Sequence, residues 1–86
     1  MFYIYVLQSE KDKHFYTGFT DNIKERLIKH NTGSVKSTKN RRPYKLIYFE
    51  MSLNKKDALH REKYLKSSWG KRYLKNRLQY YLASHS

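Results

Sequence analysis

The start of the chain, FYIYVLQ at residues 2–8, limits the fold more than any other segment because it is apolar or aromatic on two sides. β-Branched and aromatic residues favour strands, and successive side chains of a strand point to opposite faces. One face carries Phe2, Ile4 and Val6, and the other carries Tyr3, Tyr5 and Leu7. Because both faces need cover from water, we expect this segment to be the central strand of a sheet.

The next two elements are predicted to be a strand and a helix. Residues 14–19 (HFYTGF) follow a five-residue polar turn, a spacing that favours an antiparallel hairpin. Thr20 or Asp21 can cap a helix that runs to about Asn31, and Gly33 ends it. The expected buried stripe of this helix is Ile23, Leu27 and Ile28.

The middle of the chain is predicted to hold a loop, a third strand and a second helix. The loop, residues 32–43, is basic and polar, and the strand is YKLIYFEM at residues 44–51. Ser52 or Asn54 can cap the helix, which is expected over residues 55–67. Its buried side is expected to contain Ala58, Leu59 and Leu65.

The last element is predicted to be a helix over residues 71–83, after a break that Gly70 permits. Its apolar residues are Tyr73, Leu74, Leu78 and Leu82. The order is therefore ββαβαα, and three strands with helices packed on them make a small α+β fold. We expect a single domain over residues 1–86, with the third strand joined to the free edge of the first.

Composition excludes several classes of site. The chain has no cysteine, which excludes disulfides, thiolate metal sites and cysteine nucleophiles, and favours a reducing, cytoplasmic location. No segment has the roughly 18 consecutive apolar residues that cross a bilayer. The first residues lack a preceding basic region and a following cleavage pattern, so we interpret them as a strand and expect no membrane association.

Positive charge is the strongest feature of the composition. The chain has 19 Lys and Arg against 7 Asp and Glu, a net charge of +12, and residues 31–86 hold +11 of it. Such a field attracts polyanions, of which nucleic acid is the commonest. One alternative is a basic protein without a polyanionic partner. A weaker one is an anionic membrane surface, which usually requires a basic helix with a spare apolar face.

Two pairs of residues could carry chemistry. Tyr5 and Tyr16 are expected opposite each other, or one residue out of register, across the hairpin; cross-strand aromatic packing is the alternative to catalysis. Arg26 and His30 are four residues apart on the first helix and share one ridge, for which the alternative is a solvated helix face.

A third candidate is Glu62, which adjoins the apolar stripe of the second helix. A carboxylate there is costly unless it is paired, hydrogen-bonded or bound to a metal. A structural ion pair with Arg26 or a lysine is one alternative to function, and a solvated position at the edge of the stripe is another.

These residues resemble the GIY-YIG nuclease superfamily, whose two signature tripeptides correspond here to Tyr3-Ile4-Tyr5 and Tyr16-Thr17-Gly18. The match continues through Thr20-Asp21-Asn22, Arg26-Leu27, His30-Asn31, Gly33, Thr38, Pro43-Tyr44-Lys45-Leu46, Ala58 and Arg61-Glu62-Lys63. Tyr3 and Thr17 depart from the family pattern at positions that supply no catalytic side chain. The chain is most similar to short, stand-alone bacterial members related to the nuclease domain of the excision-repair C subunit.

The resemblance implies a three-stranded antiparallel sheet flanked by helices, and metal-dependent hydrolysis of DNA phosphodiester bonds. The catalytic residues that it implies are Tyr5, Tyr16, Arg26, His30, Glu62 and Asn76. Glu62 would hold one weakly bound divalent cation, Mg²⁺ or Mn²⁺, and Arg26 would clamp the phosphate. Tyr5 is the first candidate to orient or deprotonate the attacking water, with Tyr16 beside it and His30 as a relay. A phenol of pKa ~10 needs Arg26, the metal or a basic neighbour to favour the phenolate. The choice of base among these three residues stays open.

Other basic residues are expected to contact backbone phosphates, which gives affinity without choice of sequence. These residues are Lys36, Lys39, Arg41, Arg42, Lys66, Lys71 and Arg72, with Lys75 and Arg77. We expect DNA as the partner, with RNA also open, and a structure-selective or weakly specific endonuclease of repair or recombination, located with the nucleoid when DNA-bound. A protein partner that supplies specificity is also open. Trp69 can stack on a base, although core packing is its expected role.

Two other classes of function compete with the endonuclease. The first is a non-catalytic nucleic-acid-binding module on the same scaffold, which would bind in a salt-sensitive way without metal-dependent nicking. The second is an interaction subunit that relies on a separate nuclease.

Overall fold

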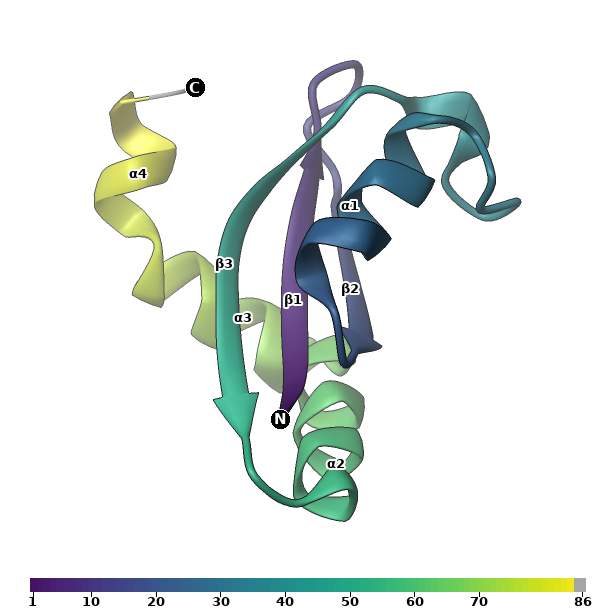
Figure 1. The fold of residues 1–86 in the computed structure, drawn as a ribbon. Helices are drawn as coiled ribbons and strands as arrows, with labels where there is room; N and C mark the ends of the chain where they lie inside the picture. The colour runs from purple at the N-terminus through teal and green to yellow at the C-terminus, as the bar shows by residue number, and fades with distance from the viewer. Residues whose placement is uncertain (85–86) are drawn as a thin grey trace.

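The computed structural model describes residues 1–84, and its sheet has the strand order β2-β1-β3 (Figure 1). The strands are β1 at Phe2–Ser9, β2 at Phe15–Thr20 and β3 at Tyr44–Ser52. Both outer strands run antiparallel to β1. The predicted α+β class, the antiparallel sheet and the central first strand are therefore confirmed.

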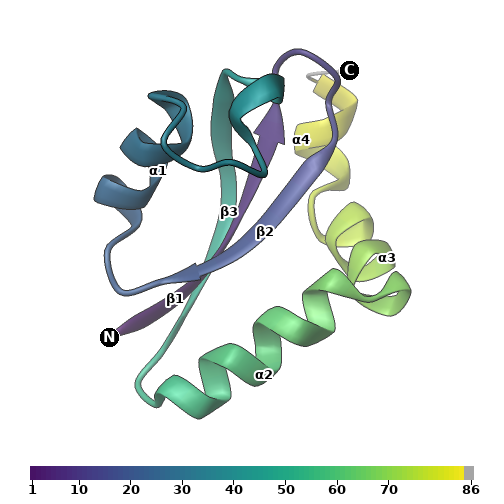
Figure 2. The same ribbon diagram turned by 90° about the vertical axis from the view of Figure 1, so that its right-hand side faces the viewer.

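The two faces of β1 belong to two separate core clusters. Ile4 and Val6 pack with apolar residues of two helices, Ala58, Leu65 and Leu74. Tyr5 and Leu7 pack on the other face with Tyr44, and partly buried Leu27 joins them. Because a strand with two apolar faces needs cover on both, the sheet lies between helical layers (Figure 2).

The helix on the Tyr5 face is α1, Ile23–Asn31, and its start and its buried side both differ from the prediction. Its N-cap is Asn22, whose side chain accepts a hydrogen bond from the Glu25 backbone N–H at 3.1 Å. Thr20 is not the cap, because its hydroxyl bonds the backbone of Asn22. Ile28 is 56% exposed, and the fully buried residue of α1 is His30. An imidazole thus takes the place expected for an aliphatic side chain.

The helices on the other face are α2 at Lys55–Lys66, α3 at Ser68–Arg77 and α4 at Gln79–Ser84. Asn54 caps α2, as one of the two predicted alternatives. Leu59 is exposed, so it does not belong to the buried side of α2 as expected. The predicted order ββαβαα is confirmed, and the segment predicted as a helix over residues 71–83 is helical, but it is divided at Leu78 between α3 and α4.

The predicted break at Gly70 is also wrong, because Gly70 lies inside α3. The break is at Ser67, whose hydroxyl accepts a hydrogen bond from the Gly70 backbone N–H at 3.2 Å. A Cβ at Gly70 would collide with the backbone of Tyr64 and Leu65. Glycine is needed here for the close approach of two helices, and not for a turn.

Loop 32–43 carries a short 3₁₀ helix, η1 at Lys39–Arg41, and is held at several points. The Ser9 hydroxyl donates to the Arg41 carbonyl at 2.7 Å. The Asn31 amide bonds both the carbonyl and the N–H of Tyr44, at 3.0 and 2.7 Å. The first bond holds the loop against β1, and the other two join the elements on either side of the loop, α1 and β3. Among residues 1–84, none of the helices combines the length and apolarity that crossing a bilayer requires.

Candidate active site

Tyr5 is the centre of the candidate site, and it is 2% exposed. It pairs with Gly18 of β2 and Phe49 of β3. A Cβ at Gly18 would overlap the Tyr5 phenol, so the phenol passes directly over the glycine. The glycine of the second signature tripeptide therefore makes room for the tyrosine of the first.

The predicted pairing of the two tyrosines is wrong by register. Tyr5 lies opposite Gly18, and Tyr16 lies opposite Leu7. The two tyrosines are therefore diagonal neighbours on one face, with ring centroids 6.4 Å apart. The Tyr16 ring also contacts the His30 ring edge-on, with centroids 4.9 Å apart.

His30 connects the Tyr5 phenol to Thr38 through its two ring nitrogens. The Tyr5 hydroxyl is 2.8 Å from Nε2, and the Thr38 hydroxyl is 2.8 Å from Nδ1. The Thr38 hydroxyl donates its own hydrogen to the Val35 carbonyl at 3.4 Å, so it accepts from His30 Nδ1–H. Nε2 is then the bare nitrogen, and it accepts the hydrogen of the Tyr5 hydroxyl.

The electrostatics agree with this assignment. Burial, assisted by the positive charge of Arg26, lowers the pKa of His30 from 6.5 to about 4. His30 is therefore uncharged at neutral pH, with one nitrogen free to accept a proton. Burial raises the pKa of Tyr5 above its ordinary value, and the hydrogen bond from Arg26 only partly opposes that rise. Tyr5 is therefore a phenol at neutral pH, and Arg26 alone does not make it a phenolate.

Arg26 lies beside both phenols. Its Nε donates to the Tyr5 hydroxyl at 3.4 Å, and hydrogen bonding to Tyr5, the largest cause, raises the pKa of Arg26 further. Arg26 is half-buried. A permanently charged guanidinium with several N–H groups can bind a phosphate through two parallel hydrogen bonds.

Glu62 lies on α2. Its charge is among the causes that raise the pKa of Tyr5, so the carboxylate lies within electrostatic reach of the phenol. Its side chain is 17% exposed and pairs with Lys66 at 3.1 Å. The two structural alternatives for Glu62 were an ion pair and a solvated position. The structure has the ion pair, with a lysine one turn along the same helix.

The donor set suits a weakly held hard cation. Within residues 1–84, no three His, Asp or Glu side chains gather as a preformed metal cluster. Mg²⁺ commonly uses one or two carboxylates and completes its shell with waters and substrate phosphate oxygens. Glu62 is a partly exposed carboxylate within electrostatic reach of the Tyr5 phenol, so it fits that pattern once Lys66 moves aside.

Apart from Lys66, which pairs with Glu62, the other predicted residues lie outside this cluster. Asn76 is exposed on α3, and no described contact joins it to Tyr5, His30 or Arg26. The predicted phosphate-contacting residues occupy exposed positions on loop 32–43 and on α2 and α3: Lys36, Lys39, Arg41, Arg42, Lys66, Lys71 and Arg72. Trp69 is 68% exposed, with the Arg72 guanidinium 5.0 Å from its ring, so the expected core packing of Trp69 is wrong.

Thr38 is one of the residues that carry the resemblance, but its place in the site was not predicted. The structure buries it, at 1% exposed, against the imidazole. A threonine in a basic, polar loop has no local pattern that predicts burial. Its pairing with His30 follows only from the path of the loop back over α1.

Comparison with known proteins agrees with the residues described above. Residues 1–79 match the GIY-YIG catalytic domain. A UPF0213 protein of Clostridium perfringens is 46% identical over 67 residues, which cover 77% of this chain and 71% of that protein. A UPF0213 protein of Staphylococcus saprophyticus is 47% identical over 66 residues, covering 76% and 79%. A UPF0213 protein of Pediococcus acidilactici is 42% identical over 81 residues, covering 87% and 82%.

The match spans every strand, the helices α1, α2 and α3, and loop 32–43, and so it covers all the residues of the candidate site. The resemblance inferred from the two tripeptides is thereby confirmed. The chain belongs to the GIY-YIG family, a family of nuclease-type catalytic domains.

Proposed function

We propose that this protein is a divalent-metal-dependent endonuclease that hydrolyses DNA phosphodiester bonds with structural or weak sequence preference. The observation that carries the proposal is the hydrogen-bonded chain Tyr5–His30–Thr38, beside Arg26 and within reach of Glu62. This arrangement combines a route for a proton with a clamp for a phosphate. Hydrolysis of a phosphodiester needs both.

The proton route begins at Tyr5. A water in line with the phosphorus loses a proton to the Tyr5 oxygen as it forms a bond to phosphorus, and the Tyr5 hydrogen moves to Nε2 of His30. The P–O bond to the leaving oxygen breaks, and that oxygen takes a proton from solvent. His30 keeps its Nδ1 hydrogen on Thr38 and becomes an imidazolium. No phenolate accumulates, which is consistent with the raised pKa of Tyr5.

Substrate binding would make His30 a stronger base. The positive charge of Arg26 is one of the two causes that lower the pKa of His30. A phosphate bound by Arg26 cancels much of that charge, so the pKa of His30 rises when substrate is present. The base is thus weak in the free protein and stronger beside a phosphate.

Glu62 would hold the cation, Mg²⁺ or Mn²⁺, together with waters and a phosphate oxygen. When bound, such a cation neutralises charge on the phosphate and on the leaving oxygen. Lys66 has to release Glu62 for this, and it is then free to contact the DNA backbone. The surface lysines and arginines add affinity that does not depend on sequence. A role in DNA repair or recombination would fit such a preference, and RNA is a second substrate to test.

Incubation of the purified protein with duplex, flap, forked and four-way DNA tests the proposal, with Mg²⁺, Mn²⁺ or EDTA in parallel. Glu62→Gln should lower the cleavage rate at least about 100-fold, the order of loss expected when charge stabilisation of the transition state is removed. Glu25→Gln is a matched control, because Glu25 also pairs with a lysine one turn along its helix, Lys29 at 3.2 Å. It should leave the rate within about twofold.

Cleavage that Glu62→Gln leaves unchanged would overturn the mechanism. Salt-sensitive binding of DNA with no metal-dependent nicking of any substrate would instead identify a non-catalytic nucleic-acid-binding module. Circular dichroism of each variant separates loss of activity from loss of fold.

A further inference from the structure

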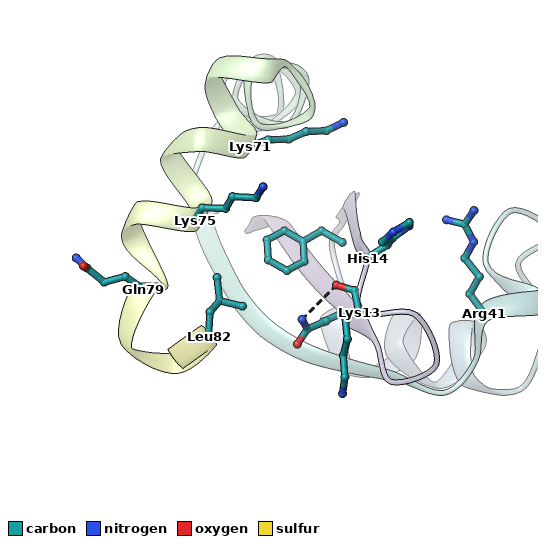
Figure 3. A pocket seen from close by; sticks show the side chains of 9 residues that line it. Lys13, His14, Arg41, Lys71, Lys75, Gln79 and Leu82 are labelled. Carbon is teal, nitrogen blue, oxygen red and sulfur yellow. Dashed lines mark hydrogen bonds between the residues drawn. The ribbon is translucent and has the colours of Figure 1, made fainter. Parts of the chain in front are cut away.

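A cleft of about 700 Å³ opens between the end of the β1–β2 hairpin and the arm formed by α3 and α4 (Figure 3). Lys71 and Lys75 project from α3 on one side, and His14 and Arg41 stand on the other. The cleft lies apart from the Tyr5–His30 cluster. None of the residues proposed for catalysis lines it.

The cleft is rich in uncompensated positive charge. Lys71 and Lys75 are exposed and one helical turn apart, and within residues 1–84 neither forms an ion pair with an acidic side chain. Like charges at this spacing repel each other. The β1–β2 turn carries two acids, Glu10 and Asp12; neither lines the cleft, and Asp12 is paired with Arg41 at 3.3 Å. A bound anion would therefore relieve repulsion between the lysines without first having to displace a carboxylate.

The cleft also has an apolar lining, supplied by Phe15 and Leu82. Phosphate contacts alone do not need such a surface, but the flat face of a nucleobase does. In a duplex the faces of the bases are covered by their neighbours. Only an unpaired nucleotide can place a base against Phe15 and Leu82 while its phosphates reach the lysines.

A second hollow, of about 240 Å³, links this cleft to the candidate active site. It shares Phe15 and Lys71 with the cleft, and it is also lined by Tyr16 and Lys66. Tyr16 contacts His30, and Lys66 pairs with Glu62. Because β2 is an edge strand, a single strand of nucleic acid can follow this edge from the proposed cutting site into the cleft.

We propose that the cleft binds an unpaired nucleotide of the strand that is cut, with its base on Phe15 and Leu82 and its phosphates on Lys71 and Lys75. This rests on the nuclease function proposed above and deepens it. It assigns the substrate class as DNA that carries a single-stranded segment next to the cleaved bond. Fully paired DNA would leave the cleft empty.

Binding in EDTA, where no cleavage occurs, tests the cleft directly. The probes are a fluorescent single strand, a fork with one unpaired arm and a blunt duplex. The paired substitution Lys71→Gln with Lys75→Gln should weaken binding of the first two roughly 20-fold at 0.1 M salt and lower their salt slope by about 1.4. Lys55→Gln with Lys56→Gln removes the same charge from an exposed part of α2 outside the cleft and is the matched control. Blunt duplex should respond equally to both pairs.

A second readout places the base. 2-Aminopurine at successive positions of the unpaired arm should change its fluorescence at one position, and Leu82→Ala should remove that change. Equal losses for fork and duplex, or no position-specific signal, would overturn the proposal. Displacement of the fork by deoxyadenosine monophosphate at the same affinity would also overturn it, because the cleft would then be a site for free nucleotides.

These outcomes are separate from the fate of the proposed function. If no metal-dependent cleavage occurs but fork binding still depends on Lys71 and Lys75, the proposed nuclease function is overturned and the cleft remains a site for an unpaired strand. If cleavage needs a metal and Glu62 but fork binding does not depend on Lys71 and Lys75, only the cleft proposal is overturned.

Discussion

At the scale of single residues, the most consequential feature is that His30 is buried and uncharged. A histidine on an amphipathic helix is usually solvated, and the spacing from Arg26 to His30 by itself predicts no more than a shared ridge. The resemblance to the family implied a role for His30 as a proton relay. The structure shows the hydrogen-bond partners of its two ring nitrogens, Tyr5 and Thr38. The register of the hairpin could not be predicted in the same way. The turn uses a left-handed residue, Lys13 at φ 67°, which no sequence pattern announces.

The pH dependence of stability tests the state of His30. Its pKa is lowered to about 4 in the folded chain, against an unfolded value of about 6.5. The unfolded chain therefore binds the proton more readily, so stability is complete above pH 6.5 and declines as the pH falls towards 4. The loss should approach about 3 kcal/mol. Urea unfolding at pH 4 to 7 measures it.

His30→Gln should remove most of the slope between pH 6.5 and 4.5, since it removes the titrating group. His60→Gln, on an exposed part of α2, should keep the slope of the natural chain. An unchanged slope in His30→Gln would mean that another group is responsible. The lowered pKa values of Asp12 and Glu50 affect the profile mainly below this range.

At the scale of elements, strands were easier to predict than helix ends. The apolar faces of β1 predict its central position, because burial on two sides leaves little choice. Helix ends depend on contacts between residues remote in sequence. Gly70 is an example, because it lies inside α3 and not at a break. Its lack of a side chain indicates a break locally, but the structure uses it for close packing of α2 and α3. The division at Leu78 has no signal, since apolar residues continue at helical spacing across it.

Asn31 joins the end of α1 to the start of β3. Its amide makes two hydrogen bonds to the backbone of Tyr44, so Asn31→Ala leaves two polar backbone groups without their partner. We expect a loss of about 1–3 kcal/mol in the free energy of unfolding. Because His30 is the adjacent residue, the cleavage rate should also fall.

Chemical denaturation measures the loss for Asn31→Ala, and Asn40→Ala provides the comparison. The described contact of Asn40 uses its backbone carbonyl, which accepts from Lys11 Nζ at 3.3 Å and which alanine retains. Asn40→Ala should therefore stay within about 0.5 kcal/mol of the natural chain. Equal effects of the two substitutions would show that the Asn31 bonds add little.

At the scale of the whole molecule, charge is as informative as fold. The net charge of +12 follows directly from the sequence, and so does its concentration in residues 31–86. The sequence did not reveal how the charges are arranged. Lys66 pairs with Glu62, Arg41 pairs with Asp12, and Lys71 faces the cleft. These positions depend on helix packing, which composition does not determine.

This charge should make DNA affinity fall steeply with salt, whatever the metal content. If about five phosphates are neutralised, the association constant for duplex DNA should fall between 10²- and 10³-fold from 50 to 200 mM salt. Fluorescence anisotropy in EDTA measures it. A nearly flat dependence would mean that the basic surface does not contact the backbone.

The strand order β2-β1-β3 has a further consequence, because β3 has a strand neighbour on one side only. Its free border offers unpaired peptide groups, and the nearby Phe49 and Met51 are each about half exposed. Two copies that paired along their β3 strands would form one continuous six-stranded sheet. Mutual repulsion between strongly cationic molecules opposes that contact at low ionic strength. Added salt, which lowers the affinity for DNA, therefore also screens the charge repulsion that keeps two copies apart and so favours aggregation.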